Sequence, residues 1–369
     1  MERYLQAQIR ADLKDKMVFV AGPRQVGKTT LAKKILGSRK GYFSWDVDLD
    51  RERILKQELG VSSLWVFDEI HKYRSWRNYL KGIYDGREPG QQILVVGSAR
   101  LDYYRYGGDS LQGRYHYLRF HPLSVAELGI QNNMELLDLL DLGPFPEPFF
   151  RGSKARAKRW SLEYRTRLIR EELTDLERIV DLGNLELLSI RLPELVGNPL
   201  SINALREDLR VSHKAVANWV RILERLYSIF LISPYGHPLI RAIQKAQKHY
   251  HFDWSVLPEP AARWENLVGA HLLKWVHFEE DTKGRALELR YFRDEDGREV
   301  DFVVTEDRRP ILLIECKWDD SPLSKELRYL KERFPAARAW QLSAIGKKDF
   351  KSPEGIRVSP ALTFLRDLC

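Results

Sequence analysis

The chain has 369 residues, a formal net charge of +8 and a pI near 9.2. This length exceeds one ordinary domain and suits two or three. Its two cysteines, Cys316 and Cys369, exclude a disulfide framework and are typical of a reducing compartment. No apolar run approaches the roughly 20 residues that span a bilayer, and residues 1–17 lack an apolar signal core. We therefore expect a cytoplasmic protein that has no membrane partner.

Short apolar runs alternate with charged, helical stretches over the first 130 residues. The runs 16–21, 41–45, 63–67 and 92–96 predict buried strands, and such alternation favours a parallel sheet covered by helices. The fold class that we predict is α/β.

A proline-rich stretch at 143–148 interrupts this pattern, because no helix or strand interior tolerates it. Residues 154–227 then read as almost wholly helical. From about 261 the order is helix, three strands, helix and strand. We expect three domains, at 1–142, 143–235 and 236–369.

Residues 22–30 match the pattern G-x-x-x-x-G-K-[ST] between an expected strand at 17–21 and an expected helix at 28–36. Glycines let such a loop turn its N–H groups around phosphate oxygens, and the positive end of the helix adds to the attraction. Lys28 would reach the β and γ phosphates, and Thr29 would hold Mg²⁺. The loop predicts an ATP and Mg²⁺ site formed by Gly22, Pro23, Arg24, Gln25, Val26, Gly27, Lys28, Thr29 and Thr30.

The run 64–69 supplies the acidic residues that such a site needs. Four apolar residues precede Asp68 and Glu69, which would emerge at the carboxyl end of a strand, where ligands of open α/β sheets bind. Asp68 would support the Mg²⁺, and Glu69 would polarise the attacking water. The alternative is a strand that ends in a solvated acidic turn.

Three further residues are candidates near the phosphates. Ser98 follows another buried run, 93–97, and could orient the water or the γ-phosphate, or could simply cap the strand. Arg100 and Arg114 could stabilise charge as an arginine finger, in cis or across a subunit boundary, or could be ordinary surface arginines. A finger from a neighbour predicts a homo-oligomer, with a hexamer as one candidate.

Residues 199–232 have the layout of a winged helix-turn-helix. Ser201 and Ser212 can cap two helices joined by a turn at 209–211. The second helix would bury one face and present the other to the phosphates and base edges of DNA, a partner that also suits the basic charge. That second face carries Lys214, Asn218, Arg221 and Arg225. The alternative is an ordinary solvated face.

Charged residues interrupt the expected strands of the last third. Asp301 lies in one strand, and Glu315 and Lys317 share a face of the next. Two carboxylates and a lysine in this order are typical of phosphodiester-cleaving sites with Mg²⁺ or Mn²⁺, and Glu265 could add a carboxylate. The alternative is an internal ion pair in a fold that does not cut. His249 and His251 have no zinc-site spacing, and we expect structural roles for both.

These motifs together resemble the AAA-type ATPases of bacteria and archaea that carry a DUF4143 domain. The resemblance covers nearly the whole chain and rests on the sequences Gly-Pro-Arg-Gln-Val-Gly-Lys-Thr, Phe-Asp-Glu-Ile-His, Gly-Ser-Ala, Gly-Arg-Tyr, Phe145-Pro-Glu-Pro-Phe149, Glu163-Tyr-Arg165, Arg191-Leu-Pro-Glu-Leu195, Glu299-Val-Asp-Phe302 and Glu315-Cys-Lys317. It implies an AAA+-like core, a helical linker with a winged helix, and a C-terminal domain of PD-(D/E)xK nuclease type. AAA+ proteins usually have asparagine where this chain has Ser98.

The function that we predict is ATP hydrolysis coupled to DNA remodelling or to a metal-dependent nuclease-like domain. The rival is a signalling ATPase of the STAND kind, whose winged helix and C-terminal domain dock proteins. DNA-stimulated hydrolysis with a steep salt dependence would favour the first.

Overall fold

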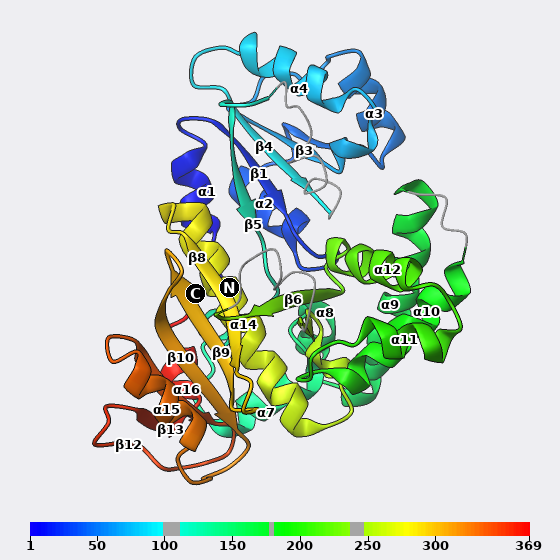
Figure 1. Ribbon diagram of the computed structural model, residues 1–369. Helices are drawn as coiled ribbons and strands as arrows, with labels where there is room; N and C mark the ends of the chain where they lie inside the picture. The colour runs from blue at the N-terminus through cyan, green and yellow to red at the C-terminus, as the bar shows by residue number, and fades with distance from the viewer. Residues whose placement is uncertain (99–110, 177–180, 237–246) are drawn as a thin grey trace. The chain divides into compact units, whose positions relative to one another are not determined.

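The computed structural model describes residues 1–98, 111–176, 181–236 and 247–369, and of 171–176 only the backbone. The chain forms two compact units, residues 1–122 and 123–369 (Figure 1). Arg100 lies outside the described residues. In the described part of the chain, no helix is both long and apolar enough to cross a membrane.

The first unit is built around a sheet in which all described strands are parallel, in the order β2-β3-β4-β1-β5. Its elements are α1 (Gln6–Asp12), β1 (Met17–Ala21), α2 (Lys28–Leu36), β2 (Tyr42–Ser44), α3 (Asp48–Leu55), β3 (Leu64–Asp68), η1 (Ile70–Lys72), α4 (Trp76–Asp85), β4 (Gln92–Gly97) and β5 (Tyr115–Arg119).

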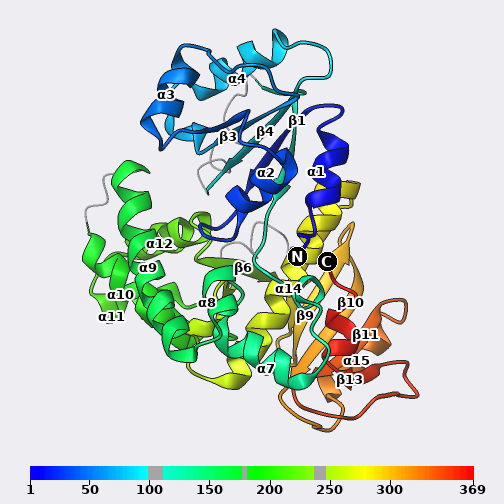
Figure 2. The ribbon, with the colours of Figure 1, turned by 180° about the vertical axis from the view of Figure 1, so that it is seen from behind.

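Successive side chains of a strand point to opposite faces of the sheet, and in this unit both faces are apolar. Met17, Phe19 and Val95 lie in one core cluster with Trp76 and Leu80 of α4. The helices α1 and α2 contact β1, β3 and β4, and Figure 2 shows both helices beside these strands. Helices on both faces bury the sheet, as expected for parallel strands. The predicted parallel sheet is confirmed.

The second unit opens with helices that run to residue 225. They are α6 (Val125–Leu128), α7 (Asn133–Leu142), α8 (Pro146–Arg151), α9 (Lys154–Leu176), α10 (Leu182–Arg191), η3 (Leu192–Leu195), α11 (Ile202–Leu209) and α12 (His213–Arg225). The predicted interruption at 143–148 separates α7 from α8, but it is shorter than expected. Helix α8 starts within it, because proline suits the first turn of a helix.

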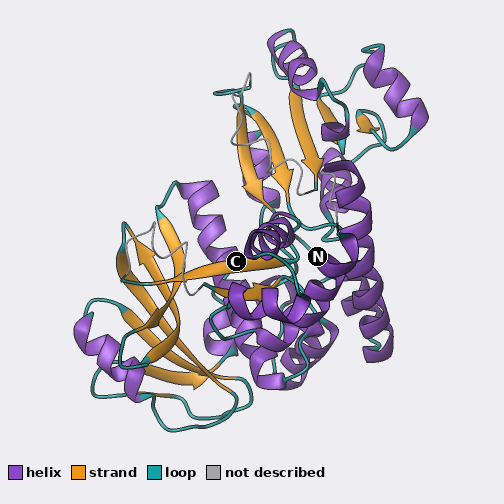
Figure 3. Cartoon of the chain, turned by 45° about the vertical axis from the view of Figure 1, so that its right-hand side comes forward, coloured by secondary structure: helices purple, strands orange, loops and turns teal. Residues whose placement is uncertain are grey.

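A mixed sheet follows, whose eight strands in the described residues have the order β12-β13-β11-β10-β9-β8-β6-β7. Its elements are β6 (Ile229–Pro234), β7 (Lys248–His251), η4 (Trp254–Val256), α14 (Pro260–Lys283), β8 (Leu287–Arg293), β9 (Glu299–Glu306), β10 (Arg309–Lys317), α15 (Lys325–Arg333), β11 (Arg338–Ser343), β12 (Phe350–Lys351), β13 (Arg357–Pro360) and α16 (Leu362–Leu365). Within this unit the strands gather on one side and the helices of residues 133–225 on the other (Figures 1 and 3).

Two elements of the sheets differ from the sequence-based expectation. The strand β5 was not expected, because Tyr115–Arg119 has only one fully buried residue, Leu118. Most of strand β6 was expected to belong to the winged helix-turn-helix at 199–232, yet the strand pairs with β7 and with β8 of the large sheet. The expected domain boundary at 235/236 therefore falls between two strands of one sheet.

Candidate nucleotide site and carboxylate cluster

The loop after β1 has a backbone that only certain residues permit. A side chain at Gly22 would place Cβ 2.1 Å from the carbonyl oxygen of Phe120. Gly27, the residue before α2, has a φ of 98°, in the left-handed region that favours glycine. Both glycines of the motif are thus required by the fold of the loop.

Lys28 is buried and folds back over the loop that precedes it. Its Nζ donates hydrogen bonds to the carbonyl oxygens of Gly22 (2.8 Å) and Pro23 (2.6 Å). Two partners of its own loop hold the ammonium beside the backbone turn, where the N–H groups of such a loop bind phosphate.

Asp68, at the end of β3, lies next to the first turn of α2. Its Oδ2 accepts hydrogen bonds from the Thr29 hydroxyl at 2.7 Å and from the Tyr42 hydroxyl at 2.6 Å. The hydroxyl and the carboxylate are the hard oxygen ligands that Mg²⁺ prefers. The residues therefore fit the magnesium ion of a nucleotide complex.

Tyr42 is the residue of this site that the sequence did not reveal. It lies on β2, the strand beside β3 in the sheet, and burial, together with the Asp68 carboxylate, raises its pKa above the ordinary value. Nothing in its local sequence marks it, because the contact depends on the pairing of the two strands.

Glu69 follows Asp68 at the end of β3, with a backbone φ of 57° in the left-handed region. Burial raises the pKa of Glu69, while Lys28 and Lys72 act in the opposite direction. Its Oε2 lies 3.3 Å from His71 Nε2 and 3.8 Å from Lys72 Nζ. Asp46 in turn accepts two hydrogen bonds from Lys72.

Ser98 and Arg114 have contrasting surroundings. Ser98 follows β4, which lies between β1 and β3 as expected. Its hydroxyl is buried and finds no hydrogen-bond partner among the described residues. Arg114 makes a two-bond ion pair with Asp85 at 2.8 and 3.1 Å on the exposed surface. Any role of Arg114 as a finger requires this pair to open.

The helix α12 of the second unit has the two faces that its sequence predicts. Ser212 caps it by accepting a hydrogen bond from the Ala215 N–H, and Ser201 caps α11 in the same way. Val216, Trp219 and Leu223 are buried. The four polar residues of the opposite face, Lys214, Asn218, Arg221 and Arg225, are all exposed.

Asp301, Glu315 and Lys317 lie close together on β9 and β10. Asp301 Oδ2 accepts a hydrogen bond from the Cys316 N–H at 2.7 Å, and Lys317 donates to Glu315 at 2.7 Å. Burial raises the pKa of both carboxyl groups, and the Asp301 charge raises that of Glu315 further. Glu315 Oε2 is buried without a hydrogen-bond partner among the described residues.

Glu265, on α14, lies in the same cluster with a buried lysine that the sequence did not indicate. Glu265 accepts a hydrogen bond from Tyr250 at 2.7 Å and lies 3.9 Å from Lys248 Nζ. Lys248 is fully buried and also donates to Glu299. We call Lys248, Tyr250, Glu265, Glu299, Asp301, Glu315 and Lys317 the carboxylate cluster.

The carboxylate cluster does not fit a metal as directly as the nucleotide loop does. No set of three or more His, Cys, Asp or Glu side chains in the described part of the chain is arranged to hold one. Lys248 and Lys317 already provide positive charge beside Glu265 and Glu315. The positive charge that the carboxylates need is thus supplied by lysines of the chain itself.

His249 and His251 are buried on β7, in keeping with the structural roles expected for them. Their rings lie 5.7 Å apart, and His249 Nε2 lies 2.9 Å from the Leu192 carbonyl oxygen. Burial lowers the pKa of both imidazoles.

Family models match three successive parts of the chain. Residues 14–129 match an AAA domain, residues 134–262 match a domain of unknown function, DUF8612, and residues 261–363 match another, DUF4143. Over 315 residues the chain is 23% identical to the uncharacterized proteins Rv2008c of Mycobacterium tuberculosis and Mb2031c of Mycobacterium bovis. The match covers 80% of this chain and 68% of each relative.

Several solved structures are also similar to the chain. The Walker-type ATPase paby2304 of Pyrococcus abyssi is 16% identical, with a TM-score of 0.44, over 71% of this chain and 95% of that one. RuvB of Thermotoga maritima is 19% identical, with a TM-score of 0.26, over 61% and 84%. A STAND protein, PH0952 of Pyrococcus horikoshii, is 13% identical, with a TM-score of 0.23, over 77% and 48%.

Proposed function

Because the chain belongs to the P-loop ATPases that combine an AAA domain with a DUF4143 domain, we propose that it hydrolyses ATP and couples this turnover to its grip on DNA. The observation that carries the proposal is the meeting of the loop and the acidic strand at one point. There Lys28 lies against its own loop, and Thr29 and Asp68 share a hydrogen bond.

In this proposal each residue of the nucleotide site has one task. The N–H groups of residues 22–30 and the Lys28 ammonium bind the phosphates, and Glu69 accepts the proton of the attacking water. Mg²⁺, held by Thr29 and Asp68, would neutralise phosphate charge. Ser98 would orient the water, a role supported by its buried hydroxyl, which has no hydrogen-bond partner among the described residues.

The DNA part of the proposal is supported by α12. Its buried face fixes the helix in the unit, and its exposed face carries three basic side chains and one amide. Lysine and arginine bind phosphates, and asparagine can pair with adenine. The alternative is that this face is an ordinary solvated surface. The salt dependence of DNA binding distinguishes these two possibilities.

The first test measures ATP hydrolysis and DNA retention of the same protein at graded salt. We expect DNA to stimulate hydrolysis and Lys28→Ala to lower hydrolysis on the order of 10²- to 10³-fold, the usual loss when a transition-state donor is removed. Lys214→Ala with Arg221→Ala should weaken DNA binding and reduce the salt slope by about 2. The matched control is Lys325→Ala with Lys351→Ala, which removes two exposed lysines elsewhere in the same unit.

Cleavage and signalling are the other outcomes of this experiment. Metal-dependent DNA cleavage that disappears in Glu315→Gln would add nuclease activity to the proposal. The observation in favour of it is that Glu315 Oε2 is buried and has no hydrogen-bond partner in the part of the chain that the structure describes. Hydrolysis that is the same with and without DNA, with no retention at low salt, would instead support a signalling ATPase that docks proteins.

A further inference from the structure

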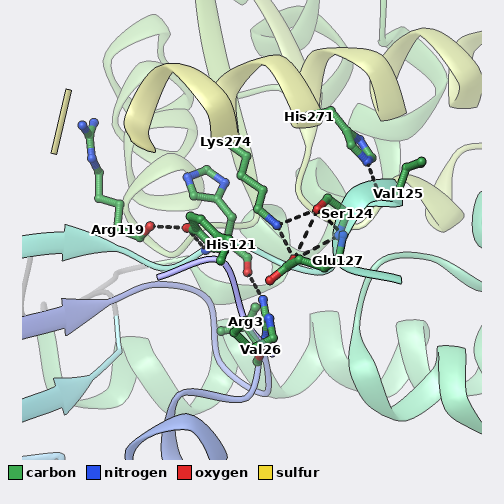
Figure 4. A network of polar contacts seen from close by, with 10 residues as sticks. Arg3, Val26, Arg119, His121, Ser124, Val125, Glu127, His271 and Lys274 are labelled. Atoms are coloured by element: carbon green, nitrogen blue, oxygen red, sulfur yellow. Dashed lines mark hydrogen bonds and ion pairs between the residues drawn. The ribbon is translucent and has the colours of Figure 1, made fainter. Parts of the chain in front are cut away.

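Arg3 links the nucleotide loop to the end of the sheet. Its guanidinium donates to the carbonyl oxygen of Val26, inside the loop, at 2.7 Å and to that of His121 at 2.6 Å. It also lies over the Phe120 ring, 4.1 Å from the centroid. The side chain is buried, and Figure 4 shows it between the two carbonyl groups.

Tyr4 holds the same segment from the next position. Its hydroxyl donates to the Arg119 carbonyl at 2.6 Å and accepts from the His121 N–H at 3.0 Å. Its ring stacks on Phe120. The Phe120 carbonyl oxygen lies so near Gly22 that a Cβ at this residue would be only 2.1 Å from it. Residues 3–4, the nucleotide loop and residues 119–121 are therefore joined by buried and partly buried contacts.

The continuation of this segment is anchored in the second unit. Lys274 of α14 donates to Ser124 at 3.0 Å and to Glu127, and His271 of α14 accepts a hydrogen bond from the Val125 N–H at 3.0 Å (Figure 4). Only Pro122 and Leu123 lie between the last residue held by Arg3 and the first held by Lys274. Leu123 also donates its N–H to the Pro144 carbonyl oxygen at 3.0 Å. We call residues 119–124, along which the chain passes from contacts within the first unit to contacts within the second, the joint.

We propose that Arg3 is a positioning residue for the nucleotide loop and connects nucleotide occupancy to the joint at residues 119–124. The proposal rests on nucleotide binding at residues 22–30. Binding of a triphosphate draws the loop N–H groups inward, and a peptide group is planar, so the carbonyl of Val26 moves with its neighbouring N–H. Arg3 fixes that carbonyl and His121 to one rigid guanidinium, whose fork geometry transmits the displacement.

The test compares Arg3→Met, Arg3→Lys and the control Arg10→Met, an exposed arginine of α1. A charge-assisted hydrogen bond to the loop is lost in Arg3→Met, so KM for ATP should rise about tenfold or more, with a smaller fall in kcat. Arg3→Lys should recover part of the KM, because an ammonium can still reach one carbonyl. Arg10→Met should match the wild type.

Hydrogen exchange supplies the second readout. With a saturating non-hydrolysable ATP analogue, amides of residues 123–128 should change their exchange in the wild type and stay unchanged in Arg3→Met. Tyr4→Phe retains the stacked ring and loses two hydrogen bonds, so it keeps the test decisive if Arg3→Met does not fold. Tyr4→Phe should reduce the exchange response of residues 123–128 while its KM for ATP stays closer to the wild-type value than that of Arg3→Met.

Two results would overturn the inference while leaving ATP hydrolysis intact. One is a wild-type KM in Arg3→Met, and the other is an unchanged exchange response in both Arg3→Met and Tyr4→Phe. A wild-type protein that binds no nucleotide at all would instead refute the assignment of residues 22–30, and the role of Arg3 would fall with it.

Discussion

Lys28 of the nucleotide loop donates to backbone carbonyl groups of its own loop, whereas Lys248 and Lys317 of the carboxylate cluster pair with carboxylates. Lys28 has two carbonyl partners within six residues of itself. Lys248 has partners 17 and 51 residues away, Glu265 and Glu299. The first site is specified by a short local sequence, and the second by the assembly of a whole sheet.

This difference has an energetic consequence. The direct hydrogen-bond partners of Lys28 in its loop are neutral carbonyl groups, and Glu69, whose pKa Lys28 lowers, keeps Lys72 at 3.8 Å when Lys28 is removed. The loss of Lys248 instead leaves its direct carboxylate partners in a poorly solvated place. Substitutions in the first site should therefore act on activity, and substitutions in the second should act on folding.

The largest effect on stability is expected for Lys248→Met. Removing one partner of a buried ion pair typically costs about 3–5 kcal/mol of the free energy of unfolding, and Lys248 is fully buried. Urea unfolding measures the loss. Lys283→Met, which removes an ammonium with a half-exposed side chain from Glu279, is the control and should lose several-fold less.

A double variant makes the comparison sharper. Lys248→Met with Glu299→Gln removes a charge of each sign from the same pair, so part of the stability should return. Equal losses in Lys248→Met and Lys283→Met would contradict the view that the carboxylate cluster depends on its internal cations.

Local signals explain why much of the first unit could be predicted from the sequence. Helix α2 has the expected bounds, and β1, β3 and β4 lie within a residue or two of the predicted runs. Each is marked by a glycine-rich loop or an apolar run. The capping serines of α11 and α12 are local signals of the same kind and are also confirmed.

Long-range pairing explains what could not be predicted. Tyr42 reaches Asp68 only because β2 lies beside β3, and β6 joins the large sheet only because it pairs with β8. Arg3 and Lys248 are single charged residues in unremarkable sequence. Their burial depends on partners more than 15 residues away, and no periodicity within one element records such contacts.

The next largest effect should come from His271 at acid pH. Its Nδ1 lies 2.8 Å from the Leu267 carbonyl oxygen and its Nε2 accepts from Val125, so the folded protein holds the neutral ring. Burial lowers the pKa of His271 to about 4, and the Lys274 charge acts in the same direction. The unfolded chain therefore binds the proton first, near pH 6.5.

Because the unfolded chain binds the proton more readily than the folded protein, acid should destabilise the folded protein. The contribution of His271 to stability is complete above about pH 6.5 and is lost as the pH falls towards 4, up to about 3 kcal/mol. Urea unfolding at several pH values in this window should show a slope in the wild type that is reduced in His271→Gln. Parallel slopes in the two proteins would show that the ring is already protonated in the folded state.

The smallest effect on stability is expected at the pair of Arg114 and Asp85. Asp85 is exposed and Arg114 is partly buried, and ion pairs at the surface add little because water and salt screen them. Arg114→Ala and Asp85→Asn should both leave the unfolding midpoint unchanged. Activity separates them: if Arg114 acts as the finger, Arg114→Ala lowers kcat at an unchanged midpoint, whereas Asp85→Asn, which releases the same arginine, does not. Equal activity in both variants and the wild type would remove Arg114 from the nucleotide site and leave its pair with Asp85 as a surface contact.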